Sequence, residues 1–535
     1  MQQFVSDKTS QPSIPDTVDV VIIGYGPVGA ALATYLGKLD VRALVIDKAS
    51  EILQMPRAIA LDNEALRVLQ QIGLEEDGFE KIIIPKVKMK CPYVGEFAEI
   101  NTSGQFDQLP KLVTFYQPDL EKALREKVAK YPHIHVSLCT EFMSYQESQD
   151  GLHVTLRDLS GAIHTVYCKY LVAADGASSK IRDMIGQSFT GQSYIEDWLI
   201  VDANQRMGKA IDHVEFICDP KRPTPHMPAP GGRERWEFML QAGENRAEME
   251  NSEKIKQLLK PWVDSEEINI ERQAVYRFHA RCCEQFSKGR IFLVGDAAHI
   301  TPPFVGQGLV AGLRDIANLG WKLSYVIKNQ TSQNILQSYD QERRPHAKKM
   351  INLAKLMGHM VMPQNKLSAI AVHGVMKSLC SLPKVGSFFT DLKVKPQNKF
   401  TNGLFHKQYK KQIFGTGGQL DQIVLTGHQG NHILSDIQFA DHFVVLGFGV
   451  DPHLYMGQKI QQQWQELGGK IFAVTAPYIS VFGEHWLTDI EMRWMSRLDQ
   501  PWIVIIRPDR IIMHEGEVKN LQKMLKSSLK LIIQK

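Results

Sequence analysis

The stretch Val18-Asp19-Val20-Val21-Ile22-Ile23-Gly24-Tyr25-Gly26-Pro27-Val28-Gly29 decides the fold of this 535-residue chain. Its first half is an apolar, largely β-branched run, which indicates a buried strand of a parallel sheet. Its second half is G-x-G-x-x-G, and the small residues that follow, 30–39, have the pattern of a helix. Glycines in this position permit a tight turn and the close approach of a pyrophosphate, which the helix N-terminus attracts. The stretch therefore predicts nucleotide binding, and the alternative is a glycine-rich packing turn.

Three further motifs place an acidic residue at the end of an apolar run: Asp47, Asp175-Gly-x-x-Ser-x-x-Arg182, and Gly295-Asp296-Ala297-Ala298-His299. The carboxylate of Asp47 stands where a ribose hydroxyl would need an acceptor. The third motif continues through a proline-containing loop, 300–308, into a helix pattern, 309–327. It thus offers a carboxylate and free backbone N–H groups in one place. We expect these motifs to lie at the same edge of one sheet.

Composition excludes several classes of protein. The 62 basic and 58 acidic residues give a net charge of +4, too balanced to indicate a nucleic-acid-binding protein. Seven scattered cysteines without a Cys-x-x-Cys pair indicate neither a disulfide framework nor a metal site, so no metal is expected. The N-terminus lacks the pattern of a signal peptide, and no apolar run approaches ~18 residues. We expect a cytoplasmic protein without a membrane span.

The order of these patterns predicts an α/β fold in which a Rossmann-like nucleotide domain is interrupted by a mixed sheet. Short strands and turn signals between 192 and 281 form most of the insertion. The proline-rich stretch 223–232 is expected to be a turn. We expect the nucleotide domain at 17–80, 111–190 and 285–360, the inserted domain at 81–110 and 191–284, a helical connector at 361–418, and a further domain at 419–535.

Taken in order, the motifs at Gly24–Gly29, Asp175–Arg182 and Gly295–His299 resemble those of the class A flavoprotein monooxygenases, the FAD-dependent aromatic hydroxylases. The resemblance implies an FAD-binding domain of Rossmann type with an inserted substrate-binding domain. The element order of the C-terminal region resembles the thioredoxin-like tail of this family. Because no Cys-x-x-Cys is present, we expect that domain to support docking or a homodimer rather than disulfide exchange.

The resemblance also implies which residues bind FAD. Three glycines would contact the pyrophosphate, one acid the adenosine ribose and another the ribityl chain, and a second glycine-rich turn would face the flavin ring. The expected cofactor-binding residues are Gly24, Gly26, Gly29, Asp47, Arg57, Gln117, Asp175, Arg182, Asp296, Gly306, Gly308 and Leu309. Asp175 and Arg182 belong to a motif associated with both FAD and NADH or NADPH.

The implied reaction is hydroxylation of a small aromatic substrate, a phenolic acid such as 3-(3-hydroxyphenyl)propionate, by a flavin C4a-hydroperoxide formed from O2. A base would ionise the phenol, and the candidates are His279, Tyr276 and His299. His299 is equally interpreted as a structural, hydrogen-bonding histidine. Arg281 or Arg222 could bind a substrate carboxylate, although a salt bridge is the alternative for each.

One departure from the family pattern stands at Val310, where related sequences usually have Asn. A backbone contact would survive this change, but a side-chain hydrogen bond would not. Two other functions stay open, the first of them because of Val310 and the proline-rich segment 224–232. The first is a monooxygenase of the same fold that modifies a polyketide or an antibiotic, and the second is a FAD-bound scaffold without turnover.

Overall fold

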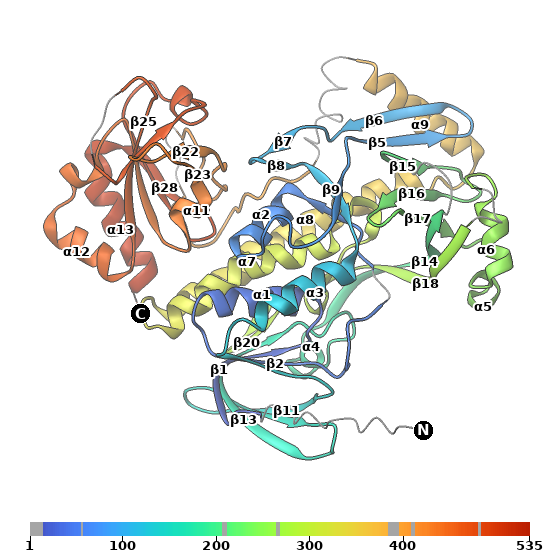
Figure 1. The fold of residues 1–535 in the computed structure, drawn as a ribbon, viewed down its shortest axis with the longest axis horizontal. Coiled ribbons are helices and arrows are strands. Elements are labelled where there is room, and N and C mark those ends of the chain that lie inside the picture. The colour runs from blue at the N-terminus through green and yellow to red at the C-terminus, as the bar shows by residue number, and fades with distance from the viewer. Residues whose placement is uncertain are drawn as a thin grey trace, which may run out of the picture.

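The structure is a computed structural model that describes residues 14–54, 57–205, 211–263, 268–382, 395–407, 412–479 and 483–534. Three large sheets organise it (Figure 1). The N-terminal sheet and its helices lie in the centre of the view, a second sheet lies to one side, and the C-terminal domain, orange to red, lies on the other side. The expected α/β fold is confirmed.

The central sheet brings the acidic turns together. Its strands are β1 (Thr17–Ile23), β2 (Ala43–Ile46), β10 (Ile134–Ser137), β11 (Glu141–Glu147), β12 (Leu152–Arg157), β13 (Ile163–Ala173), β19 (Ser287–Lys288) and β20 (Ile291–Leu293). β10, β2, β1, β13 and β20 are parallel neighbours in that order. The carboxyl ends of β1, β13 and β20 therefore meet at one edge, where open α/β sheets bind ligands.

Helices cover this sheet with apolar surfaces. They are α1 (Pro27–Lys38), α3 (Gln117–Val128) and α7 (Gly308–Ile327). Most of α7 is buried, from Val310 to Val326, because it packs against α1 on one side and against α8 (Ser338–Val361) on another. A small sheet of β3 (Ala60–Asp62), β9 (Leu112–Phe115) and β4 (Lys81–Ile83) lies beside α2 (Asn63–Gln71). β4 thus pairs outside the second large sheet, to which its range was expected to belong.

The second sheet has the order β21-β18-β14-β17-β16-β15-β5-β6. Its strands are β5 (Lys86–Cys91), β6 (Gly95–Asn101), β14 (Phe189–Gln205), β15 (Val214–Ile217), β16 (Thr224–Ala229), β17 (Arg233–Met239), β18 (Ile268–Cys283) and β21 (His299–Ile300). The short helices α5 (Arg246–Met249) and α6 (Ser252–Leu259) contribute to a core with β14 and β17. Contacts of η2 (Pro303–Val305) with α8, and of β6 with α9 (Lys366–Cys380), join this sheet to the helices.

Only the end of the proline-rich stretch, residues 230–232, is the turn that we expected. Residues 224–229 form the fully buried strand β16, which pairs with β15 and β17. Pro225 and Pro228 cannot donate to the ladder, a loss that normally confines proline to sheet edges. Here both rings are buried, and Pro225 lines a cavity, so apolar burial offsets the missing donors.

The C-terminal domain is a seven-stranded sheet in the order β23-β22-β26-β25-β24-β27-β28. Its elements are β22 (Val424–Thr426), β23 (His432–Leu434), α11 (Ser435–Phe439), β24 (Val444–Phe448), α12 (Gln458–Glu466), β25 (Lys470–Thr475), β26 (Trp486–Asp489), β27 (Trp502–Ile506), β28 (Ile512–Glu517) and α13 (Leu521–Ile533). β24, β25 and β26 are parallel, whereas β27 is antiparallel to β24.

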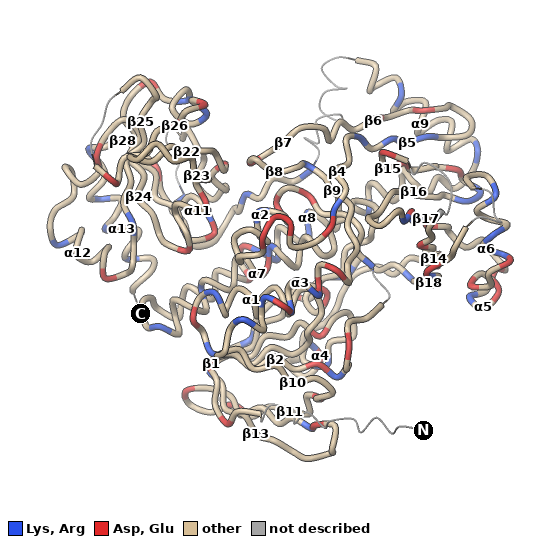
Figure 2. The backbone as a smooth tube through the Cα atoms, in the orientation of Figure 1, with Lys and Arg blue, Asp and Glu red and all other residues tan. Residues whose placement is uncertain are grey.

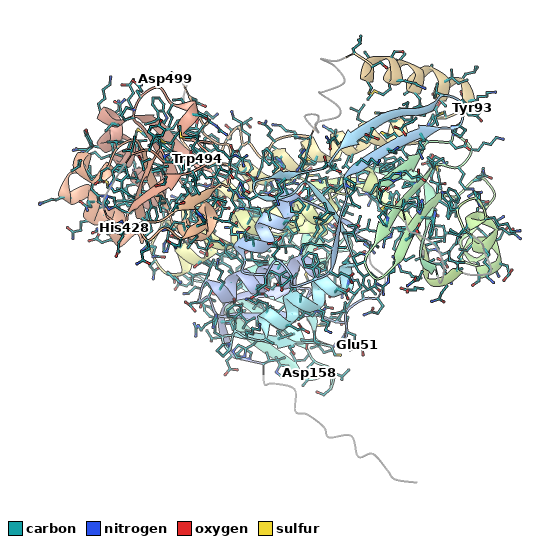
Figure 3. All side chains as sticks on the ribbon, turned by 45° about the horizontal axis from the view of Figure 1, so that its top comes forward. Glu51, Tyr93, Asp158, His428, Trp494 and Asp499 are labelled. Carbon is teal, nitrogen blue, oxygen red and sulfur yellow. The ribbon has the colours of Figure 1, made fainter. Side chains whose placement is uncertain are left out.

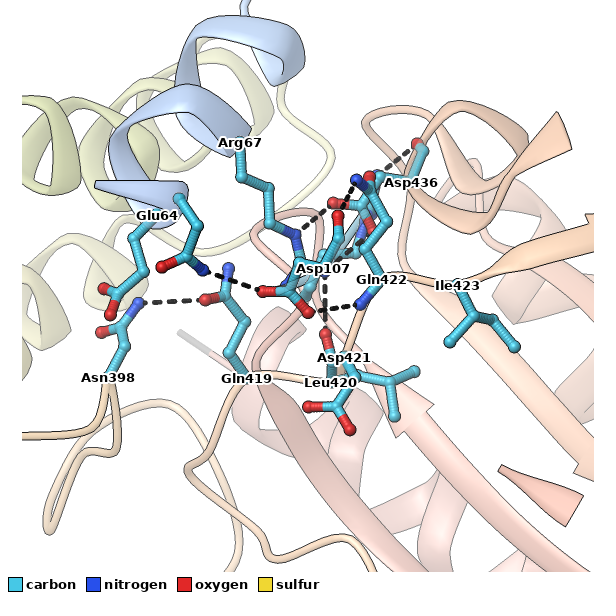
Figure 4. Close-up of polar contacts among 12 residues, drawn as sticks. Glu64, Arg67, Asp107, Asn398, Gln419, Leu420, Asp421, Gln422, Ile423 and Asp436 are labelled. Carbon is cyan, nitrogen blue, oxygen red and sulfur yellow. Dashed lines mark hydrogen bonds and ion pairs between the residues drawn. The ribbon is translucent and has the colours of Figure 1, made fainter. Parts of the chain in front are cut away.

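Buried charges attach this domain to the central one. Arg67 of α2 forms a bidentate pair with Asp436 at 2.6 and 2.9 Å and also contacts Asp107 at 3.3 Å (Figure 4). Deeper in the interface, Glu342 lies 2.9 Å from the Lys322 ammonium and 3.0 Å from the Arg507 guanidinium. All three side chains are inaccessible to solvent. Because a buried charge is costly once its partner is lost, these pairs fix the position of the domain on α7 and α8.

The exterior is of mixed charge. Figure 2 shows basic and acidic residues interspersed along all parts of the chain. Among the described residues, no helix is both long enough and apolar enough to cross a membrane.

Candidate active site

One cavity of about 1490 Å³ connects the central sheet with the second sheet. Its lining contains most of the predicted cofactor residues: Gly24, Gly26, Asp47, Arg57, Gln117, Asp175, Asp296, Gly306, Gly308 and Leu309. Of the three predicted bases it contains Tyr276 and His279. It does not contain Gly29, Arg182, His299, Arg281 or Arg222. The cavity has a polar end at the edge of the central sheet and an apolar end against the second sheet.

The three glycines of the G-x-G-x-x-G motif are needed for different structural reasons. Gly24 has φ +102°, and a Cβ there would lie 2.4 Å from the carbonyl oxygen of Ala174. A Cβ on Gly29 would lie 2.0 Å from the carbonyl oxygen of Gly24. Gly26 differs, because its φ of −70° and ψ of −175° suit any residue and a Cβ would meet no protein atom within 4 Å. Protein packing therefore explains two of the glycines, and a ligand that fills the open space explains the third.

Asp47 closes the same turn from the neighbouring strand. Its carboxylate accepts the backbone N–H of Tyr25 at 2.7 Å and that of Ala49 at 2.8 Å. The remaining lone pairs face the cavity. The backbone N–H groups at the start of α1 have no side-chain cap, which leaves them available to an anion.

In the middle of the cavity, the loop at Arg57 is hydrogen-bonded to Gln117 at the start of α3. The Gln117 side-chain oxygen accepts the backbone N–H groups of Arg57 and Ala58 at 3.0 and 2.9 Å. The Arg57 guanidinium lies 3.9 Å from the carboxylate of Asp296 and 5.5 Å from the ring centre of Tyr276. Burial raises the pKa of Asp296, and Arg57 acts in the opposite direction. A hydrogen-bonding polyol chain would meet both a donor and an acceptor here.

His299 has a structural role. It is 1% exposed and lies 2.8 Å from the carboxylate of Asp315, which also accepts the backbone N–H of Gly295 at 3.0 Å and is paired with Arg343 at 2.9 Å. Burial opposes ionisation of Asp315, but the charges of His299 and Arg343 hold its pKa below the usual range. The network fixes the turn η1 (Gly295–Ala297), which carries Asp296. His299 thus orients the acid rather than facing the cavity.

Asp175 and Arg182 have different positions relative to the cavity: Asp175 lines it, whereas Arg182 supports a turn that lies beside it. Asp175 lines the cavity, its Oδ1 is buried without a hydrogen-bond partner among the described residues, and burial raises its pKa. Arg182 is 5% exposed, stacks 3.9 Å from the ring centre of Phe189, and donates to the carbonyl oxygen of Ala297 at 3.3 Å. It therefore braces the turn next to Asp296.

A second glycine turn lies across the cavity. Gly306 ends η2 with φ +61°, and α7 begins at Gly308 without a side-chain cap. Gln307 is fixed by Asp62 at 3.0 Å and by Arg314 at 2.9 Å. Val310 occupies the position where related sequences usually have Asn. Its side chain is fully buried in the core of α7 and does not line the cavity.

The far end of the cavity is apolar. Its lining comes from six strands of the second sheet, from η2, and from α8 and α9: Val87, Met89, Ala98, Ile100, Ile200, Val214, Phe216, Met227, Phe278, Phe304, Met350, Leu353, Met357, Met360 and Met376. Phe278 and Phe304 meet edge to face at 6.0 Å between ring centres. Such a chamber excludes water and fits a flat, apolar ring.

Glu237 stands in this apolar chamber and was missed at the sequence level. It lines the cavity, is 7% exposed, and has no hydrogen bond to another described residue. Burial raises its pKa, although Arg235 acts against the shift. Arg235 itself is paired with Asp202 at 2.6 and 2.9 Å. The alternation Arg235-Trp236-Glu237-Phe238 was a usable signal, because two charged residues on one face of a strand are costly unless that face serves a site.

The predicted bases have different surroundings. The Tyr276 hydroxyl accepts a hydrogen bond from Arg272 at 2.8 Å. The Nδ1 of His279 lies 2.9 Å from the Ser193 hydroxyl, which also accepts from Arg281 at 2.6 Å. Burial, followed by the charges of Arg281 and Arg277, lowers the pKa of His279. These surroundings favour the neutral form of the His279 ring.

Arg222 does not reach the cavity. Its guanidinium pairs with both carboxylate oxygens of Glu244 at 2.7 and 3.0 Å and donates to the carbonyl of Met239 at 2.8 Å. This arrangement corresponds to the salt-bridge alternative. The cavity lining contains Arg246 and Arg277 instead, and Arg277 is paired with Asp197 at 2.7 and 3.0 Å.

Comparisons with known proteins agree with this geometry. A family profile described as an FAD binding domain matches residues 17–354, and one described as the HcaD C-terminal domain matches residues 417–531. The 3-(3-hydroxy-phenyl)propionate/3-hydroxycinnamic acid hydroxylase of Escherichia coli O139:H28 is 30% identical over 532 residues, 96% of this chain and 95% of the relative. The Klebsiella pneumoniae protein of that name is 30% identical over 519 residues, with coverages of 94% and 92%.

Two solved structures share the fold. The flavin-dependent monooxygenase PieE in complex with FAD and substrate has a TM-score of 0.80 at 17% identity, covering 97% of this chain and 100% of that one. The OxyS anhydrotetracycline hydroxylase from Streptomyces rimosus has a TM-score of 0.76 at 21% identity, covering 97% and 99%.

Proposed function

Because this chain belongs to the family of FAD-binding monooxygenases, we propose that it hydroxylates the ring of a phenolic acid such as 3-(3-hydroxyphenyl)propionate. NADH or NADPH is the reductant and O2 the co-substrate. The observation that carries this proposal is a cavity that joins a glycine-lined nucleotide end to an apolar chamber with Glu237, a buried carboxyl group that has no hydrogen bond to another described residue. The substrate class is supported by the names of the relatives at 30% identity.

The residues present fit FAD. The open space at Gly26, the orphaned Oδ1 of Asp175 and the uncapped starts of α1 and α7 all suit an extended dinucleotide with a pyrophosphate in its middle. Asp47 would hold the adenosine ribose and Asp296 the ribityl chain. When bound and reduced, the flavin would supply oxygen activated for transfer to an electron-rich ring.

The protein's own side chains do the remaining work. Phe278, Phe304 and the methionines exclude water from the chamber, which protects a reactive oxygen species from loss. Glu237, whose pKa is raised by burial, is placed to form a hydrogen bond with the substrate. In the tautomer that donates Nδ1–H to Ser193, the Nε2 of His279 retains a lone pair that takes up the phenolic proton.

We assign the substrate carboxylate to Arg246 rather than to Arg222 or Arg281. Arg246 lines the cavity, its side chain is 65% exposed, and its nearest acid, Glu250, is 3.8 Å away. Arg277, the other arginine of this lining near the chamber, is already held by Asp197 at both nitrogens. Arg246 donates through Nη2 to the carbonyl oxygen of Val275 and has only a long contact with Glu250, so its guanidinium is more available to a propionate tail than that of Arg277.

A larger polycyclic substrate is the second candidate. Six methionines line the cavity, namely Met89, Met227, Met350, Met357, Met360 and Met376. Methionine adapts to irregular shapes, so the chamber could also hold a polyketide. Screening phenolic acids and polycyclic phenols for accelerated NADH oxidation separates these functions. If 3-(3-hydroxyphenyl)propionate neither accelerates NADH oxidation nor yields a dihydroxylated product, the specific assignment fails.

We further propose that residues 419–535 form a thioredoxin-like domain. The strand order β25-β24-β27-β28, with α12 between β24 and β25 and α13 after the β27–β28 hairpin, supports this assignment. All seven cysteines are free, and none forms a Cys-x-x-Cys pair. The buried pairs Arg67–Asp436 and Arg507–Glu342 support a role in holding α2, α7 and α8 in place.

A further inference from the structure

Three side chains of the C-terminal domain converge on one point outside the active site. Asp451 follows β24, His453 lies in the turn η4 (Pro452–Tyr455), and His485 directly precedes β26. One ligand atom from each lies within 4.8 Å of those from the other two. Among the described residues, none of the C-terminal domain lines the active-site cavity, so the two sites are separate.

The carboxylate of Asp451 bridges the two imidazoles. Its Oδ1 lies 2.8 Å from Nδ1 of His453, and its Oδ2 lies 3.1 Å from Nε2 of His485. Oδ1 also accepts the backbone N–H of His453 at 2.9 Å, which fixes the orientation of the carboxylate. The two rings are 5.0 Å apart and nearly perpendicular, at 77°. Two ring nitrogens and one carboxylate thus point at a common centre.

We propose that Asp451, His453 and His485 bind a divalent ion of the zinc class. Two imidazoles and a carboxylate, with one coordination position left for water, form a recurrent zinc ligand set. A tetrahedral ion with ligand bonds of about 2.0–2.1 Å separates its ligand atoms by about 3.3 Å. The separations of 2.8 and 3.1 Å join the two imidazoles to different oxygens of Asp451, and one ligand atom of each side chain lies within 4.8 Å of the other two. Side-chain rotations would therefore bring the three ligand atoms to the spacing of a tetrahedral ion as it replaces the ring protons.

The surroundings support an ion that enters from solvent. The side chains of Asp451, His453 and His485 are 17%, 33% and 32% exposed, so they are accessible but partly desolvated. Nitrogen ligands favour zinc, cobalt, nickel and copper over magnesium and calcium, which prefer oxygen. The bound ion would join the loop after β24 to the start of β26 and so stabilise the domain.

The test uses the full-length, FAD-loaded protein after chelator treatment and removal of the chelator. Calorimetric titration with ZnCl2 is expected to show one site per chain, and Co2+ is expected to give the visible bands of a histidine-ligated ion. A hundredfold excess of zinc over its Kd should raise Tm by at least about 3 °C. Asp451→Asn and His485→Gln should each weaken zinc binding at least tenfold.

The matched control is His428→Gln, an exposed histidine of the same domain that is labelled in Figure 3. It should bind zinc as the wild type does. The proposal is overturned if the double variant His453→Gln/His485→Gln binds zinc as tightly as the wild type. It is equally overturned if the wild type binds no zinc, or binds Mg2+ as tightly as Zn2+. The flavin spectrum of each variant shows whether its fold is intact.

Discussion

The two ends of the cavity are built by different means. At the nucleotide end, backbone turns set the shape, and an added Cβ at Gly24 or Gly29 would collide with a carbonyl oxygen. At the substrate end, side chains from a sheet of eight strands set the shape, and no short motif contains them. A binding site formed by backbone groups is recognisable from a short, continuous sequence motif. A binding site formed by side chains from many strands consists of residues that are scattered along the sequence.

The largest effect is expected from Gly26→Val. The new side chain meets no protein atom near Cβ and projects into the space for the pyrophosphate. We expect a folded but colourless protein whose affinity for FAD falls at least a thousandfold, about 4 kcal/mol. Equilibrium titration with FAD measures the loss. The control is Gly374→Ala, where a Cβ also meets nothing within 4 Å but lies in α9, and it should stay yellow. Full FAD content in Gly26→Val would remove the distinction between packing and ligand glycines.

Asp296→Ala should have the next largest effect. In the proposed site the carboxylate accepts from the ribityl hydroxyls, and loss of a charge-assisted hydrogen bond costs about 1.5–3 kcal/mol. FAD affinity should therefore fall roughly 10- to 100-fold by the same titration. Asp150→Ala, an exposed acid, is the control. A yellow Asp296→Ala protein with wild-type affinity would contradict the assignment.

Glu237→Gln should leave FAD affinity unchanged and raise KM for the phenolic acid about tenfold, about 1.4 kcal/mol. The substitution should also change how the free energy of unfolding depends on pH. Since burial raises the pKa of Glu237 above its usual 4.5, the folded protein keeps a proton that the unfolded chain has lost. The free energy of unfolding therefore falls as pH rises through that window.

Glutamine does not ionise, so the stability of Glu237→Gln relative to wild type should increase from pH 5 to pH 8, at about 1.4 kcal/mol per unit of pKa shift. Urea unfolding of both proteins at the two pH values provides the comparison. An equal difference at both pH values would mean that Glu237 is ionised throughout.

Tyr276→Phe should have a moderate effect. It removes the hydroxyl that accepts from Arg272 but keeps the ring beside Arg57. We expect kcat/KM to fall about threefold to tenfold, near 1 kcal/mol, with FAD affinity preserved. Steady-state kinetics with NADH in excess measures this. A loss of FAD instead would place Tyr276 at the nucleotide end.

Arg222→Gln should have the smallest effect on activity. Its guanidinium is engaged by Glu244 outside the cavity, so kcat/KM should stay within about twofold while stability falls by about 1 kcal/mol. Arg246→Gln provides the contrast, because it should raise KM without a matching loss of stability. If Arg222→Gln raises KM as strongly as Arg246→Gln, the carboxylate site has been misplaced.

The same contrast explains what the sequence could predict. Glycines before helices and acids after apolar runs are local patterns, and the α/β fold and nucleotide binding followed from them, whereas FAD was implied by the resemblance that the three motifs carry to the flavoprotein monooxygenases. The role of His299 depends on Asp315, and that of Arg222 depends on Glu244, partners that only the folded chain brings together. The strand β16 was unpredictable because two prolines indicate a turn unless burial compensates. The alternation along β17 showed that Glu237 shares a face with Arg235, but the sequence did not show that this face lines the cavity.

The most direct measurement follows the oxygen atom. The FAD-loaded protein is supplied with NADH, 3-(3-hydroxyphenyl)propionate and 18O2, and the product is analysed by mass spectrometry. We expect a dihydroxylated product that carries one 18O atom, formed in proportion to the NADH consumed. Oxidation of NADH that yields only hydrogen peroxide, or a product without 18O, for each phenolic acid tested would contradict aromatic hydroxylation at this site.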